Sequence, residues 1–160
     1  MDVTLYTQNL IDDIRNKSHY EVASIADDDA RYRAEAGTEK LSEIKRCIQE
    51  AIGRLTHRLY PYLNEAYTFD MTDDLDVPTD SAGATTHTAG YKFEFDMSER
   101  RADGKKEPLR NAMHSFVVHY ALSFFYSTVS QSELSNKHGV AALEEANHLD
   151  EIIYTKKAPR

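Results

Sequence analysis

The seven histidines have the most versatile chemistry in this chain, because a neutral imidazole can ligate a metal ion or act as a general base. His114 and His119 are five residues apart, whereas two ligands on one helical face need a step of three or four. Glu145 and His148 have the spacing used in di-iron helical bundles, but such a site needs a second copy and two further glutamates. The histidines therefore fit ordinary helix residues better than ligands, and we expect no metal site.

Signs of other catalytic chemistry are weak. The single cysteine, Cys47, lies in a helical pattern, and nothing near it in the sequence offers the basic, accessible setting that a nucleophilic thiol needs. We expect it to be a small core residue. The patterns GxGxxG, GxxxxGK[ST] and GxSxG, typical of phosphate loops and nucleophile elbows, do not occur. The sequence therefore predicts no catalytic residue, no cofactor and no enzyme.

Two acidic stretches could hold a cation. Residues 27–29 are three consecutive aspartates, and residues 73–80 contain four more. Both lack the glycine and the terminal glutamate of an EF-hand loop, so solvated charge is the simpler interpretation. A divalent-ion site within residues 73–80 stays open as an alternative.

Composition limits the class of protein. The chain has 160 residues, enough for one domain, and its 19 basic against 27 acidic residues give a net charge of -8. An acidic chain is a poor nucleic-acid binder, because that affinity comes from neutralising phosphates. One cysteine excludes a disulfide scaffold, and only 6 glycines and 4 prolines favour long helices. Without a long apolar run or a secretory leader, we expect a soluble, intracellular protein with no membrane contact.

The spacing of apolar residues predicts a mainly helical domain. A first helix is expected from near Thr4, and a capping box at Ser18 and Glu21 predicts a second helix there. The clearest amphipathic pattern covers residues 38–60, where apolar residues recur at steps of three and four. Pro61 should end or kink that helix.

The pattern changes to alternation in the middle of the chain. Apolar and polar residues alternate over 67–71 and again over 91–97, which is typical of strands, and we expect these two to pair antiparallel. The long connection between them, residues 72–90, would project as an arm. The predicted fold is mainly α: one domain, residues 1–160, a helical bundle with an inserted two-stranded antiparallel β-hairpin arm at about 66–98.

Two helices are expected after the arm. Pro108 suits the first position of a helix that is apolar nearly all round and should therefore be the central one. A break between Ser130 and Glu133 is left open by the sequence. A last amphipathic helix is expected from about Val140, followed by a short basic tail, residues 155–160.

Two features favour contacts with other proteins. Ten tyrosines exceed what one small core needs to bury, and tyrosine is common at interfaces; partial exposure of the same side chains is the alternative. The charges are also separated, since residues 72–90 hold four acids and no lysine or arginine, whereas a basic cluster follows at residues 100–110. Opposite patches suit a head-to-tail interface that closes into a ring, with chance separation as the alternative.

The order of these patterns resembles the head–tail connector (adaptor) proteins of tailed bacteriophages. An amphipathic helix ends in Leu59-Tyr60-Pro61-Tyr62-Leu63, and an irregular or β segment follows. A helix opened by Pro108-Leu109 runs through Met113 to Leu122, and a final helix covers Val140 to Tyr154. The resemblance spans most of the chain.

The resemblance implies a structural role. Such a protein is a helical subunit of a ring, commonly of twelve copies, that docks below the portal protein and receives the tail or a stopper protein. DNA passes through its channel without specific binding, and the protein is not an enzyme. It would be made in the cytoplasm of the bacterial host and reside in the virion, at the head–tail junction. An acidic channel fits this role, because DNA should slide past it.

The arm at 72–90 and the tail at 155–160 would be docking elements by the same resemblance. The residues expected at contacts with the portal, the neighbouring subunit or the tail are Asp73, Asp74, Asp76, Asp80, Tyr91, Phe93, Arg100, Arg101, Lys105, Lys106, Tyr154, Lys156 and Lys157. Three alternatives remain: another neck or tail-completion protein of the same virion, a helical enzyme with a His–carboxylate site, and a small regulator that binds one protein partner.

Overall fold

The computed structural model describes residues 1–64 and 90–154. These residues are mainly helical and include one two-stranded antiparallel sheet, as the sequence predicts for the fold class. The elements, in chain order, are β1 (Asp2–Tyr6), α1 (Thr7–Val22), α2 (Asp28–Ala34), η1 (Thr38–Lys40), α3 (Leu41–Leu59), η2 (Tyr60–Tyr62), β2 (Gly90–Glu94), α4 (Glu99–Ala102), α5 (Lys106–Thr128) and α6 (Ser132–Tyr154).

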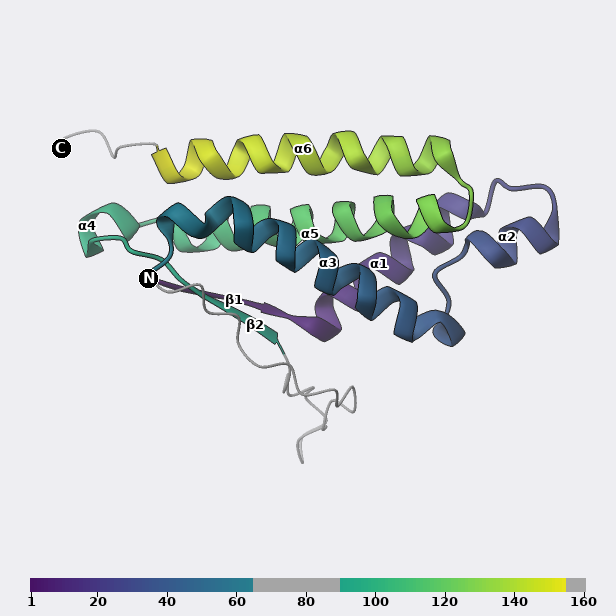
Figure 1. Ribbon diagram of the computed structural model, residues 1–160, viewed down its shortest axis with the longest axis horizontal. Coiled ribbons are helices and arrows are strands. Elements are labelled where there is room, and N and C mark those ends of the chain that lie inside the picture. The colour runs from purple at the N-terminus through teal and green to yellow at the C-terminus, as the bar shows by residue number, and fades with distance from the viewer. Residues whose placement is uncertain (65–89, 155–160) are drawn as a thin grey trace, which may run out of the picture.

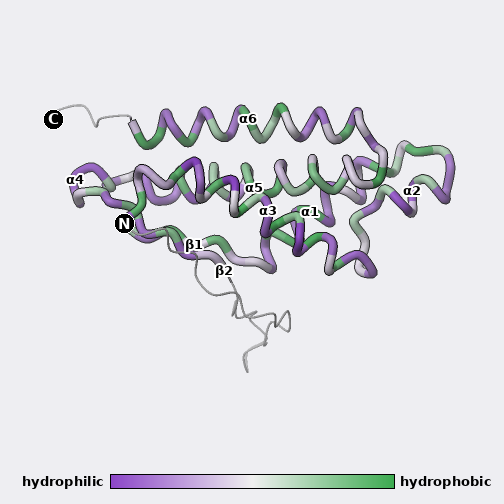
Figure 2. Tube along the Cα trace, in the orientation of Figure 1, coloured by the Kyte–Doolittle hydropathy of each residue, from purple (hydrophilic) through white to green (hydrophobic). Residues whose placement is uncertain are grey.

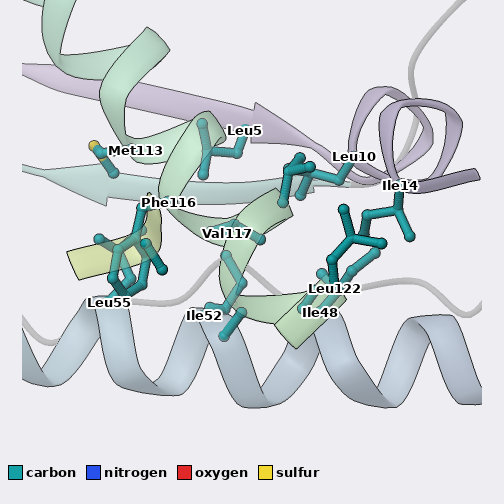
Figure 3. Close-up of a cluster of buried hydrophobic side chains, with 14 of the residues drawn as sticks. Leu5, Leu10, Ile14, Ile48, Ile52, Leu55, Met113, Phe116, Val117 and Leu122 are labelled. Atoms are coloured by element: carbon teal, nitrogen blue, oxygen red, sulfur yellow. The ribbon is translucent and has the colours of Figure 1, made fainter. Parts of the chain in front are cut away.

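Helix α5 is the centre of the bundle, as its apolar composition predicts. It packs against α6, α3, α1 and β1, and Figure 1 shows it lying between α6 on one side and α3 with α1 on the other. The tube in Figure 2 is coloured by the hydropathy of each residue along these helices. In Figure 3, Val117 and Leu122 of α5 lie between Leu10 of α1 and Ile52 of α3, and all four are buried. Pro108 falls in the first turn of α5, where no helical hydrogen bond needs its missing N–H.

The amphipathic pattern at residues 38–60 is confirmed as η1 followed by α3. Its buried face includes Ile44, Ile48 and Leu55, which repeat at helical spacing. The helix ends at Leu59, and Pro61 lies in the short η2 turn that follows. The break that the sequence left open near Ser130 is present. Helix α5 ends at Thr128, Ser130 adopts a left-handed φ of 60°, and α6 starts at Ser132.

Two predictions about the N-terminal helices are wrong. Residues 2–6 form strand β1 rather than a helix from Thr4, and α1 begins at Thr7. Ser18 does not cap a second helix, because α1 runs through it without a break. Its side chain is buried, and its Oγ accepts a hydrogen bond of 2.8 Å from the N–H of Ala36. Ser18 therefore satisfies a buried backbone donor from a distant loop, a demand that local spacing does not reveal.

The strand predicted near residues 91–97 is confirmed as β2, but the partner seen here is β1. The register places Val3 opposite Phe93 and Leu5 opposite Tyr91, and all four side chains point into the core. At Gly90 an added Cβ would come within 2.5 Å of the Leu5 carbonyl oxygen, so close pairing with β1 requires glycine. The other strand of the predicted hairpin arm, 67–71, and the connection at 72–89 lie outside the described residues.

Lys40 closes the C-terminal end of α2. Its Nζ donates hydrogen bonds to the carbonyl oxygens of Tyr32, Arg33 and Glu35 at 2.7, 2.7 and 2.8 Å. These carbonyls have no partner within the helix, and a cation at a helix C-terminus also interacts favourably with the helix dipole.

We expect Lys40→Met to lower the free energy of unfolding by about 1.5–3 kcal/mol, the range for hydrogen bonds from a charged donor. Urea denaturation would measure this loss. Arg46→Met is the matched control, because Arg46 is an exposed cation on α3 and should change stability by less than about 0.5 kcal/mol. Equal effects of the two substitutions would contradict the capping role.

Candidate functional site

An open pocket of about 570 Å³ lies where β1 and the start of α1 meet α5. The pocket is polar, and the side chains able to do chemistry come from two helices. Asp12 and Asp13 lie on α1, whereas Arg110 and His114, one turn apart, lie on α5. The lining residues are Thr4, Leu5, Tyr6, Asn9, Asp12, Asp13, Arg110, Asn111 and His114.

Asp13 and His114 form a pair in this pocket. His114 Nε2 lies 2.6 Å from Asp13 Oδ2, and the His114 side chain is 25% exposed. Nearby, Arg110 forms an ion pair with Glu107 at 2.5 Å. A carboxylate that fixes one nitrogen of an imidazole orients the ring for acid–base work or for ligand binding. The partner of His114 lies 101 residues away in the sequence, so spacing along one helix does not reveal it.

A second cluster of titratable groups is buried between three helices. His138 Nε2 on α6 lies 2.7 and 2.8 Å from the carboxylate oxygens of Glu21 on α1, and His138 Nδ1 lies 2.9 Å from His119 Nδ1 on α5. Burial lowers the pKa of His119 to about 4, with the neighbouring His138 as a further cause. Burial also lowers the pKa of His138, against the opposing effect of Glu21.

No group of three or more metal-ligating side chains occurs within residues 1–64 and 90–154. His114 and His119 take part in different clusters. On α6, His148 lies 3.7 Å from Glu151 rather than in a site with Glu145, and both side chains are exposed. Cys47 is buried and burial raises the pKa of its thiol to about 11, which confirms it as a core residue.

Two of the predicted contact residues are placed in the core. Tyr91 and Phe93 are 5% and 0% exposed, because they occupy the inward positions of β2. Neither side chain is accessible to another protein, so their assignment to an interface is wrong. The burial also raises the pKa of Tyr91 to about 12.

The remaining predicted contact residues divide into four groups. Arg101 and Lys105 donate to the carbonyl oxygen of Ile153 at 3.1 and 3.2 Å, so they close the C-terminal end of α6. Tyr154 is 61% exposed, and its hydroxyl bonds to that of Tyr62. The exposed cations are Arg100 and Lys106; the residues outside the described ranges are Asp73, Asp74, Asp76, Asp80, Lys156 and Lys157.

One surface was not predicted from the sequence, the outward face of α6. This helix packs chiefly on α5, and Figure 1 shows its other side uncovered by the described chain. Val140 and Leu143, one turn apart, are each 59% exposed. We call Val140 and Leu143 the α6 outer face. The signal in the sequence was an α6 pattern with more apolar residues than one contact face needs.

Comparison with known proteins adds no relative: no family model, no curated protein and no solved structure matches this chain. Within the part of the chain that the structure describes, no helix is long and apolar enough to cross a membrane.

Proposed function

We propose that this chain is a structural subunit of a virion that forms an oligomeric ring at the head–tail junction of a tailed bacteriophage. The ring docks on the portal protein and receives the tail or a stopper protein, and a dodecamer is the expected assembly. DNA passes through its channel without being bound specifically, which suits a net charge of -8. In this role the chain performs no catalysis.

The observation that carries the proposal is the α6 outer face. Val140 and Leu143, two aliphatic side chains on a regular helix, remain in water. Covering a valine or leucine side chain completely is worth about 1.5–3 kcal/mol, so a neighbouring subunit seated there would gain affinity. The order of α3, α5 and α6 supports the proposal further, since it follows the plan of the connector family.

Electron microscopy of the purified chain mixed with a bacteriophage portal protein would test the proposal. We expect closed rings attached to one end of the portal. Rings that bind a tail protein but not the portal would favour another neck or tail-completion protein of the same virion. A compact one-to-one complex without rings would favour a regulator and contradict the ring.

A second candidate function, a helical enzyme with a His–carboxylate site, is favoured by the Asp13–His114 pair in its open pocket. If this candidate is a metalloenzyme, the purified protein should carry bound metal in elemental analysis. His114→Ala should then lose the metal, whereas His57→Ala, which changes an exposed histidine of α3, should keep it. Metal-free wild-type protein would contradict the metalloenzyme.

A further inference from the structure

Three helices meet at one buried chain of hydrogen bonds near the turn between α5 and α6. Glu21 lies near the end of α1, His119 in the middle of α5, and His138 in the second turn of α6. Figure 1 shows the end of α1 close to this turn. The side chain of His138 is 4% exposed and that of Glu21 14%, so the link between them is shielded from water. Lys137 adds a contact with Glu21 at 3.2 Å.

These hydrogen bonds join α6 to α1, two helices that share few other contacts. The two imidazole rings lie within 28° of one plane with centroids 5.2 Å apart, and their Nδ1 atoms are 2.9 Å apart. This geometry is that of a hydrogen bond between ring edges. Tyr126 of α5 covers His138 from one side, with ring centroids 5.7 Å apart.

The number of protons decides whether these bonds can all exist. With both rings neutral, His119 Nδ1–H donates to His138 Nδ1, and His138 Nε2–H donates to the Glu21 carboxylate. With one added proton, His138 donates from both nitrogens, and His119 Nδ1 accepts. With two added protons, both Nδ1 atoms carry hydrogen, so two donors and two positive charges face each other across 2.9 Å. Only the third state breaks the hydrogen bond between His119 and His138.

We propose that Glu21, His138 and His119 form an acid-released latch, which holds the start of α6 against α1 and opens when both histidines are protonated. The latch tolerates the first proton and responds to the second, so it gives a threshold rather than a gradual loosening. Its opening separates the start of α6 from the end of α1, while the Ser123–Ser135 hydrogen bonds still join this part of α6 to α5. This inference does not depend on the proposed ring.

The groups around the latch set the direction of its response. From α1, Lys17 disfavours protonation of both histidines, and Glu21 favours it. From α6, Lys137 disfavours protonation of the histidines. On α5, burial raises the pKa of Tyr126 to about 12, so this side chain is neutral. Glu35 contributes to the rise in the pKa of Tyr126. The folded-state pKa of His119, about 4, lies below its unfolded value near 6.5. The stability it confers is therefore complete above pH 6.5 and is lost as the pH falls toward 4.

Hydrogen exchange of the full chain between pH 7.5 and 4 tests the latch directly. We expect the protection factors of residues 132–140 to fall at least tenfold over this range, while those of residues 41–59 in α3 change much less. In His119→Gln, the side-chain amide donates to His138 Nδ1 and cannot be protonated. This variant should keep protection at residues 132–140 down to pH 4.

His148→Gln is the matched control, because it removes an exposed histidine from the same helix and should follow the wild-type profile. Should His119→Gln fail to fold, nitrogen NMR of the wild-type imidazoles gives a second reading. His119 and His138 should then share one proton before residues 132–140 lose protection. A wild-type protein with unchanged protection at pH 4, or His119→Gln with the wild-type profile, would overturn the latch.

Discussion

Phe93→Ala should lower the free energy of unfolding by about 3–5 kcal/mol, the usual loss when a fully buried aromatic side chain is truncated. Phe93 is 0% exposed and lies opposite Val3 in the β1–β2 pair. Its ring holds the N-terminal strand against the helices, so removing it leaves a cavity at the point where two distant parts of the chain meet. A domain of this size has total stability of about 5–15 kcal/mol, and the variant should melt far below the wild type.

Urea denaturation followed by circular dichroism measures this loss. Tyr20→Ala is the control, because Tyr20 is an aromatic residue of α1 that is 78% exposed, and its loss should change stability by less than about 0.5 kcal/mol. If Phe93→Ala were as stable as Tyr20→Ala, Phe93 would not be a core residue. The prediction from the sequence that Phe93 contacts another protein would then stand again.

Leu143→Glu should abolish self-association while leaving the fold unchanged. Leu143 is 59% exposed on the α6 outer face, so an added carboxylate stays in water in the isolated chain. At a subunit contact the same change removes about 2 kcal/mol of apolar burial and buries a charge. Each 1.4 kcal/mol is about a tenfold change in affinity, and a ring repeats the loss at every contact.

Gln49→Glu is the matched control for the added charge, because Gln49 is exposed on α3, away from the α6 outer face. We expect it to assemble like the wild type in sedimentation velocity, whereas Leu143→Glu sediments as a monomer. Both variants should unfold at the wild-type urea concentration. If Leu143→Glu assembled as strongly as the wild type, the α6 outer face would not be part of the subunit interface.

The helices were the most predictable part of the fold. Apolar residues repeat at helical spacing in α3, and α5 is apolar nearly all round. Both patterns depend on local sequence and on burial, and both helices are present in the structure. Strand β1 was missed because its alternation covers only five residues, and its partner β2 begins at residue 90. The role of Ser18 was also missed, because the N–H that it satisfies belongs to Ala36, in a loop 18 residues away in the sequence.

The candidate sites were less predictable than the helices. Spacing along one helix showed that His114 and His119 do not share a ligand face, and the structure gives each a partner on another helix. Those partners, Asp13 and His138, are brought close by packing, which a single sequence does not encode as a visible pattern. The α6 outer face was also not predicted, because the extra apolar residues of an amphipathic helix are expected to be buried.

The mass of the assembly tests the central claim most directly. Mass photometry of the full chain, alone and with a bacteriophage portal protein, distinguishes a monomer from a ring. The proposal predicts a discrete species of about twelve copies, formed alone or on the portal, that is lost in Leu143→Glu and kept in Gln49→Glu. A monomer at every concentration, with no binding to the portal at any ratio, would contradict it.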